Sequence, residues 1–326
     1  MDTEASLRLP TYADSSPHLS HVLYIDDEKL RSLASALAST ALTTPNWRLP
    51  VYPQDDDDRF VQFIGVQNAL NFCFFNPEVG SKFYVDYQDQ IWGGATALCA
   101  ALLRALDSGI DILDSAVLAN LSMKDANQIF APYGAPLPML SERVALLNSL
   151  KPSLAPYEGS FANVIRASDY DAVQTIERLV AFPAYGTDRD LWPRSHEPIA
   201  FDKRARLFTI IYEGRARDSE TLPTLSSVDQ IGPAVDYQLP RYLRSEGVLV
   251  YGTDLAAKVD SQTLIAPGSE EELVLRSATG EVCRLLVDEI NAKRTSPISM
   301  VELDFAMWVG GRQAKGNHHL TLTTAY

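Results

Sequence analysis

Two carboxylates and a lysine stand at positions where a folded chain could use them for chemistry. Asp236 lies in GPAVDYQLP, between Pro233 and Pro240, and this pattern predicts irregular backbone leading into a helix. One interpretation is that Asp236 caps the following helix, RYLRSEG, by accepting backbone N–H bonds. The other is that the turn aims this carboxylate into a pocket. The local sequence leaves both interpretations open.

The lysine belongs to the segment PIAFDKRARLFTIIYEG, residues 198–214, which predicts a helix with an apolar stripe facing a core. Lys203 points away from that stripe. With Pro198 in the first turn, Lys203 and Arg204 would lie near the N-terminal end, where the helix dipole favours anions over cations. The pair therefore predicts a compensating anion nearby. The alternative is that both side chains lie on the surface, with their stems along apolar neighbours.

The second carboxylate belongs to SMVELDFAMWVG, residues 299–310, another predicted helix. Ser299 and Glu302 have the spacing of a capping box, and the final glycine is predicted to end the helix. Asp304 and Trp308 are four residues apart and share one face. A carboxylate there can accept hydrogen bonds from the donor edge of a purine-like base while an aromatic ring stacks on it. The alternative for Trp308 is simple core packing.

Helical periodicity dominates the chain, so the sequence predicts a mainly α protein with minor β. The segments with helical spacing are residues 26–40, 93–109, 141–150, 168–182, 198–214, 268–292 and 299–310. Ser141 is the predicted N-cap of its helix. Residues 319–326 alternate like a strand, residues 66–75 end in an aromatic run that suits a short buried strand, and the DDDD run at 55–58 predicts a solvated acidic loop.

The composition predicts a folded protein. The 326 residues are 46% hydrophobic and 21% charged, which is enough apolar material for a large core. No linker or repeat divides the chain, so we expect one domain over residues 21–326 after a tail at 1–20. The sequence shows neither a signal peptide nor an apolar run of membrane-spanning length, which predicts a cytoplasmic or nuclear protein without a membrane partner.

The charge and the cysteines exclude further classes. A net charge of −14 repels a polyphosphate, so we expect no stable nucleic-acid binding, although one or two local cations could still hold a single phosphate. Three cysteines in apolar surroundings predict reduced core thiols: Cys73, Cys99 and Cys283.

Standard catalytic motifs are absent from the sequence. It contains no dinucleotide-binding, P-loop, zinc-protease or Gly-x-Ser-x-Gly pattern, and Ser160 is predicted as a helix cap rather than a nucleophile. His318 and His319 would point to opposite faces of a strand, so they predict no shared metal ion.

Seven sequence blocks, taken together and in order, resemble the queuosine salvage protein family, the queuosine 5'-phosphate N-glycosylase/hydrolases. The blocks are NFCFFNPE, GGATALCAALLRALDSGI, SERVALLNS, GSFANVIRAS, FDKRARLF, VDYQLPRYLRSEGVLVYG and SMVELDFAMW. The resemblance implies a helical fold like that of helix-hairpin-helix DNA glycosylases. It also implies hydrolysis of queuosine 5'-monophosphate to queuine and ribose 5-phosphate, without a metal or an organic cofactor.

The resemblance implies roles for individual residues. Asp236 matches the family's catalytic aspartate, and Lys203 matches a lysine that looks like part of the same site. Asp304 and Trp308 match the aspartate and tryptophan of the family's C-terminal helix motif. An ionised Asp236 would stabilise the oxocarbenium-like transition state and could deprotonate the attacking water.

The leaving group sets a second requirement. A 7-deazaguanine has carbon in place of N7, so its departure must be assisted by hydrogen bonds at its other edges, a role that suits Asp304. Phe72, Phe74, Tyr237 and Trp308 are the candidates for stacking on the ring, and the Lys203–Arg204 pair is the candidate for holding the 5'-phosphate.

The chain departs from the family at three positions. Gln238, Leu320 and Leu322 stand where arginines are common, whereas His319 is kept. These changes bear on local charge more than on the reaction. Two other functions stay open from the sequence: a helical DNA or nucleotide glycosylase of different specificity, and a non-enzymatic helical adaptor.

Overall fold

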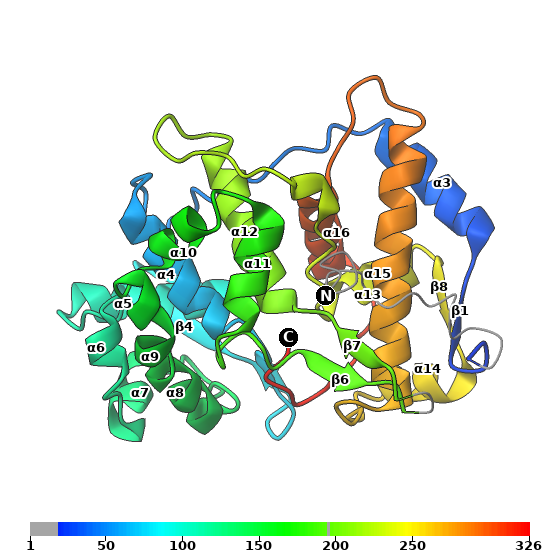
Figure 1. Cartoon of the computed structure of the whole chain (residues 1–326). Helices are drawn as coiled ribbons and strands as arrows, with labels where there is room; N and C mark the ends of the chain where they lie inside the picture. The colour runs from blue at the N-terminus through cyan, green and yellow to red at the C-terminus, as the bar shows by residue number, and fades with distance from the viewer. Residues whose placement is uncertain (1–18, 194–195) are drawn as a thin grey trace. The chain divides into compact units, whose positions relative to one another are not determined.

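The structure is a computed structural model that describes residues 19–193 and 196–326 (Figure 1). These residues form two compact units. Unit 1 contains residues 19–45, 188–206 and 227–322, and unit 2 contains residues 46–187, 207–226 and 323–326. The predicted tail lies almost entirely outside the described residues, and the single domain over 21–326 stays a prediction. The described residues contain no helix long and apolar enough to cross a bilayer.

The described residues of unit 1 are mainly helical and include two small antiparallel sheets. Its helices are α3 (Asp27–Ala38), α13 (Gln238–Ser245), α14 (Thr253–Asp260), α15 (Glu270–Asn291), α16 (Met300–Gln313) and the 3-10 helix η3 (Val228–Gln230). Its strands pair as β1 (Leu23–Ile25) with β8 (Leu249–Tyr251) and β6 (Arg189–Leu191) with β7 (Pro198–Ala200). The helices at 26–40, 268–292 and 299–310 are therefore confirmed.

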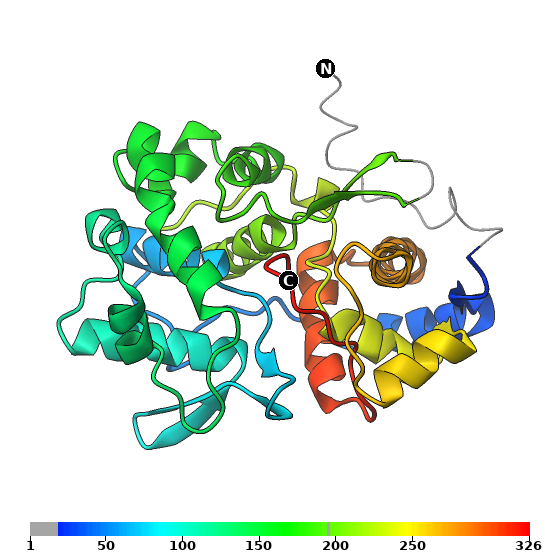
Figure 2. The same ribbon diagram turned by 90° about the horizontal axis from the view of Figure 1, so that it is seen from below.

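The core of unit 1 is built around α15. Ser269 caps this helix by accepting the Glu272 N–H, and three glutamates in its first turn complement the helix dipole. Both views show α3 running beside α15 (Figures 1 and 2). Buried apolar residues of α3, α13, α15 and α16 belong to one cluster, which gives α13 and α16 a rigid support.

Helices α13 and α16 pack at unusually short range because α16 presents glycines to α13. A Cβ at Gly310 would lie 2.6 Å from the Tyr242 ring, and one at Gly311 would lie 2.3 Å from the Gln238 carbonyl oxygen. The capping box of Ser299 and Glu302 at the start of α16 is confirmed. The prediction that Gly310 ends this helix is wrong, because the close packing uses the glycine inside the helix.

The helix predicted over residues 198–214 begins later than expected. Residues 198–200 form strand β7, and α12 covers Lys203–Ala216. Pairing with β6 satisfies the backbone groups that a helix would otherwise have used, and so Pro198 lies in a strand rather than in a first helical turn. Residues 203–206 of α12 belong to unit 1, and the remainder belongs to unit 2.

Unit 2 contains a larger number of short helices. They are α4 (Asp58–Ala69), α5 (Ala95–Asp107), α6 (Ser115–Leu118), α7 (Met123–Ile129), α8 (Leu140–Asn148), α9 (Leu150–Leu154), η2 (Ala155–Tyr157), α10 (Phe161–Ala167) and α11 (Ala172–Val180), together with the rest of α12. Its hairpins pair β2 (Phe75–Asn76) with β3 (Ser81–Lys82) and β4 (Tyr84–Tyr87) with β5 (Gln90–Gly93).

Some local predictions for unit 2 are wrong in detail. Ser141 lies inside α8, whose N-cap is Met139. Residues 66–69 end helix α4 rather than entering a strand, and strand pairing starts only at Phe75. The acidic run at 55–58 is mostly exposed as expected, but Asp57 also caps α4 by accepting N–H bonds from Arg59 and Phe60. Short segments can satisfy the same pattern in more than one way.

The C-terminal residues form no named strand within the described part of the chain. The strand predicted at 319–326 is reduced to a single bridge between Leu264 and Leu320. Ser160 does occupy the N-cap position of α10, although its side chain makes no capping bond. All three cysteines are buried and free, which confirms their prediction as core thiols.

Candidate active site

Asp236 lies in the turn that leads into α13, and its carboxylate is buried. Its Oδ1 accepts the backbone N–H groups of Gln238 at 2.7 Å and of Leu239 at 3.3 Å. The capping interpretation is therefore confirmed, and the helix it caps begins earlier than RYLRSEG. Because both bonds use Oδ1, capping holds the carboxylate in one orientation while the second oxygen, Oδ2, takes no part in the cap.

Lys203 is the first residue of α12 and is only 2% exposed. Its backbone N–H donates to Asp188 Oδ2 at 2.9 Å, which supplies the acceptor that a helix N-terminus requires. The residue before it, Asp202, has a φ of 50° and binds Arg189 through its own carboxylate, at 3.0 Å from Nε to Oδ1. Arg204 is also fully buried, which excludes the alternative of a Lys–Arg pair on the surface.

Asp188 is in turn bound by an arginine of α15. Arg276 Nη1 lies 2.6 Å from Asp188 Oδ1, and Nη2 lies 2.8 Å from Oδ2, which makes a bidentate pair. Nη2 also donates to the Val235 carbonyl oxygen at 3.2 Å. Glu272, one turn earlier on α15, accepts from Nη1 at 3.4 Å.

Asp304 points from α16 toward the same segment of backbone. Its Oδ2 accepts the N–H of Ala234 at 2.8 Å, two residues before Asp236. Asp304 is buried, which is unusual for a charged residue. The segment 234–236 is thus bound by α16 through Ala234 and by α15 through Val235.

Lys203, Asp236 and Asp304 influence one another electrostatically. Burial lowers the pKa of Lys203 to about 8, and the charge of Asp236 opposes this shift. Burial raises the pKa of Asp236, and Lys203 opposes that shift. Burial also raises the pKa of Asp304 to about 7, with a further contribution from the nearby Asp236 and opposition from the Ala234 N–H. A buried group of two acids and one base with shifted pKa values is typical of an active site.

The shift at Asp304 predicts a pH-dependent stability. A folded-state pKa of about 7, above the unfolded value of about 3.9, means that protonated Asp304 favours folding, and that this contribution is lost as the pH rises toward 7. The asparagine of Asp304→Asn cannot ionise, so its stability lacks this pH dependence. As the pH rises from about 4 to about 7, we therefore expect the melting temperature of Asp304→Asn to increase relative to that of wild type. Melting curves of both proteins test this, and a difference that does not change with pH would contradict it.

The remaining predicted residues of unit 1 lie close by in the sequence or on the same helix. The ring of Tyr237 packs against that of His318 in a tilted arrangement, with centroids 4.4 Å apart. Trp308 is half-buried, packs against the core of unit 1 and stacks on Phe305 at 6.3 Å. The guanidinium of Arg312 lies 4.9 Å from the Trp308 ring centroid. Tyr237 and Trp308 thus already have ring partners within unit 1.

Phe72 and Phe74 belong to unit 2, where both are buried. The guanidinium of Arg143 lies 4.0 Å from the Phe72 ring centroid and 5.5 Å from that of Phe74. Arg143 also donates to the carbonyl oxygens of Leu70, Phe72 and Cys73, so it holds this aromatic segment in an irregular conformation. Residues 72–74 therefore form a loop after α4, and only Phe75 at the end of the aromatic run enters a strand.

Comparison with known proteins decides the family. Residues 51–326 match the family model described as "Queuosine salvage protein". The chain belongs to the queuosine salvage protein family. A relative from Sphaerobacter thermophilus is 28% identical over 313 residues, covering 93% of each chain. Relatives from Bos taurus and Mus musculus are 27% and 28% identical, covering 88% and 89% of this chain and 87% and 88% of their own. All three are named queuosine 5'-phosphate N-glycosylase/hydrolase.

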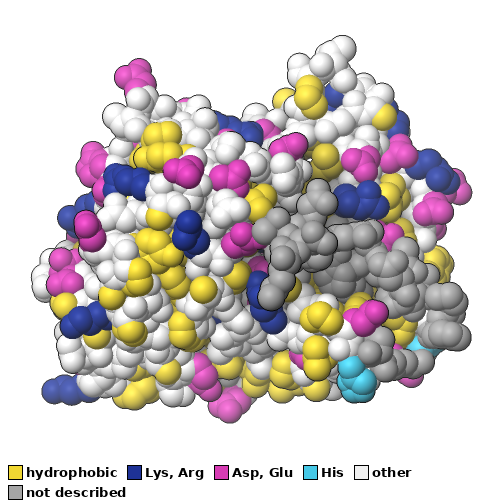
Figure 3. Space-filling view, viewed as in Figure 1, with side chains coloured by type: hydrophobic (Ala, Val, Ile, Leu, Met, Phe, Trp, Pro, Cys, Tyr) yellow, Lys and Arg dark blue, Asp and Glu magenta, His cyan; other side chains and the backbone are white. Residues whose placement is uncertain are grey.

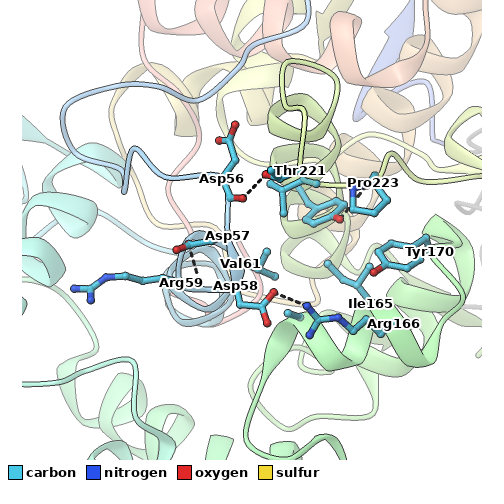
Figure 4. Close-up of a pocket in the computed structure, with 13 residues that line it drawn as sticks. Asp56, Asp57, Asp58, Arg59, Val61, Ile165, Arg166, Tyr170, Thr221 and Pro223 are labelled. Atoms are coloured by element: carbon cyan, nitrogen blue, oxygen red, sulfur yellow. Dashed lines mark hydrogen bonds and ion pairs between the residues drawn. The ribbon is translucent and has the colours of Figure 1, made fainter.

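In this queuosine salvage protein, a pocket of about 400 Å³ lies elsewhere, in unit 2 (Figure 4). It is lined by the start of α4 and by residues of α10 and α12, and it contains none of the predicted site residues. Its polar groups bind one another: Asp58 pairs with Arg166 at 2.6 Å, and Tyr212 donates to the Pro223 carbonyl oxygen at 2.9 Å. The buried cluster of unit 1 is therefore the stronger candidate for chemistry.

Asp188 and Arg276 also contact the site, although the sequence did not predict either residue there. One signal was available: Glu272 and Arg276 lie four apart in the otherwise apolar segment EELVLRSATG, which suggests a buried ion pair. Asp188 gave no comparable signal, because its partners Lys203 and Arg276 are distant in the sequence. Only the fold brings them together.

Proposed function

We propose that this chain hydrolyses the N-glycosidic bond of queuosine 5'-phosphate and releases queuine and ribose 5-phosphate. The observation that carries the proposal is the cluster of Lys203, Asp236 and Asp304 in unit 1, three buried ionisable groups whose pKa values are shifted by burial and which interact electrostatically. The substrate class, queuosine 5'-phosphate, comes from the names of relatives whose similarity covers most of the chain.

Asp236 is proposed as the catalytic carboxylate. Cleavage of an N-glycosidic bond develops positive charge on the ribose, and a fixed carboxylate stabilises that charge without reorganising. The caps at Gln238 and Leu239 occupy Oδ1, so we assign Oδ2 to the ribose and to the attacking water. Lys203 favours the ionised form of Asp236, which is the form that can accept a proton from water.

Lys203 and Arg204 are proposed to hold the 5'-phosphate. Both are buried at the start of α12, where backbone N–H groups and the helix dipole also favour an anion. Their two positive charges could bind a phosphate through charge-assisted hydrogen bonds. This supports a preference for the nucleotide over the nucleoside.

Asp304 is proposed to bind the departing base. With Oδ2 occupied by Ala234, its Oδ1 could accept from the N–H donors of the deazaguanine. Tyr237 and Trp308 of unit 1 remain the proposed stacking partners for the ring, and stacking by Phe72 and Phe74 stays a prediction from the sequence. No metal or organic cofactor enters this scheme, since the charge is stabilised by side chains.

The cellular context follows from the same substrate. We propose a cytoplasmic enzyme, with the nucleus as the alternative location, that supplies queuine for tRNA modification and does not bind nucleic acid stably. Among the described side chains visible in Figure 3, lysines and arginines are interspersed with acidic side chains. We also propose that the helical fold is similar to that of helix-hairpin-helix DNA glycosylases.

The test is a thermal-shift titration with queuosine 5'-monophosphate, followed by detection of free queuine. We expect the melting temperature to rise with nucleotide concentration, because ligand binding to the folded state stabilises it. We also expect turnover to be insensitive to added DNA. A non-enzymatic adaptor predicts neither a shift nor release of the base, and a DNA glycosylase predicts activity on DNA instead.

A further inference from the structure

We propose that Arg276 is a positioning residue that fixes the Asp236 turn relative to Lys203. The inference rests on the proposed function, because it assigns Arg276 a part in the same site. Arg276 itself would not contact the substrate. It would act by fastening the two chain segments that carry the catalytic carboxylate and its neighbouring cation.

The first contact of Arg276 is with the start of α12, through Asp188. Both terminal nitrogens of Arg276 bind Asp188, and the same Oδ2 that accepts from Nη2 also accepts the backbone N–H of Lys203. The guanidinium carbon also lies 4.0 Å from the ring centroid of Phe201, two residues before Lys203. Arg276 therefore contacts Phe201 before the turn into α12 and is linked through Asp188 to Lys203 after it.

The second contact of Arg276 is with the turn that carries Asp236. Nη2 of Arg276 donates to the Val235 carbonyl oxygen at 3.2 Å, and this carbonyl belongs to the peptide bond that leads into Asp236. One nitrogen thus binds both the carboxylate that caps α12 and the backbone next to Asp236. Moving either segment requires a change at the same guanidinium.

This arrangement requires an arginine. The planar guanidinium has several donors in a rigid fork, so it can bind a carboxylate through two nitrogens, bind a carbonyl and stack on a ring at the same time. A lysine keeps the positive charge but offers one flexible ammonium in place of the fork. Arg276 and Asp188 are 2% and 3% exposed, so water cannot easily replace the missing bonds.

Arg276→Lys separates positioning from charge. We expect kcat for queuine release to fall by ~10-fold or more while KM stays within ~3-fold, because misplacing reacting groups weakens the transition state more than the bound ground state. The control is Arg284→Lys, on the same helix, where an exposed arginine pairs with Asp288. This control should retain wild-type kinetics.

Hydrogen–deuterium exchange gives a readout that does not depend on activity. In Arg276→Lys, we expect faster exchange at the amides of Lys203, Ala234 and Gln238, because their hydrogen bonds hold the fastened segments. Peptides from α4 and α5 in unit 2 should exchange as in wild type. Arg284→Lys should leave all of these peptides unchanged.

Each outcome decides the inference. Unchanged exchange at these amides, or faster exchange with unaltered kcat in an active enzyme, would overturn it. If wild type releases no queuine, the proposed function fails, and faster exchange in Arg276→Lys would still establish the fastening. Should Arg276→Lys not fold, Asp188→Asn replaces it with the same expected results, and loss of cooperative melting in both variants would show that the network serves stability alone.

Discussion

Asp236→Asn is expected to slow the release of queuine from queuosine 5'-monophosphate by at least about 10²-fold. The amide keeps the shape of the side chain and one oxygen that can still accept the N–H groups of Gln238 and Leu239. It removes the negative charge that would stabilise the ribose cation and the basic oxygen that would accept a proton. The measurement is single-turnover release of queuine at saturating nucleotide.

A melting curve of the same sample separates catalysis from capping. Asp236→Asn should melt close to wild type, and Asp229→Asn, at an exposed position of η3, serves as the matched control with full activity. Near-full turnover by a well-folded Asp236→Asn would remove Asp236 from the catalytic role. If activity is lost only with the fold, the residue acts as a cap, and Asp304 becomes the next carboxylate to test.

Lys203→Met is expected to reduce kcat/KM for the 5'-phosphorylated substrate by about 10²-fold, and that for the nucleoside by much less. Methionine preserves most of the buried volume of the side chain, which is 2% exposed, but removes the charge. The nucleoside has no 5'-phosphate, so it has no contact with Lys203 to lose. The measurement is kcat/KM for both substrates with each protein.

The control for this comparison is Lys258→Met, where a more exposed lysine of α14 binds Glu271 at 2.7 Å. It should leave both substrates unaffected. Equal losses on nucleotide and nucleoside by Lys203→Met would contradict the phosphate role. They would leave Lys203 a role in the ionisation of Asp236 alone. Its charge counteracts the rise in the Asp236 pKa that burial causes.

Local features of the fold followed from the sequence where short-range physics decides them. The helices α3, α15 and α16 have caps and apolar stripes within a few residues, and their starts agree with prediction to within two residues. The burial of the three cysteines was likewise evident from their apolar surroundings. The catalytic role proposed for Asp236, by contrast, came from the family resemblance, since its local sequence fitted capping equally well.

Prediction failed where a distant partner satisfies the backbone. Pro198 appeared to begin a helix, but β6 pairs with residues 198–200 and delays α12 to Lys203. Gly310 appeared to end a helix, but the close approach of Tyr242 requires a glycine there in the interior of α16. Neither partner is close enough in the sequence for a window of neighbouring residues to reveal it.

The sequence by itself determined the residue types available for chemistry, the mainly helical fold and the family. The tertiary structure alone decided that Lys203 is buried rather than exposed, and that Asp188 and Arg276 connect it to the Asp236 turn. The physical reason is that a buried charge is tolerated only where partners compensate its lost hydration. Those partners come from segments up to 88 residues apart, and only folding makes them neighbours.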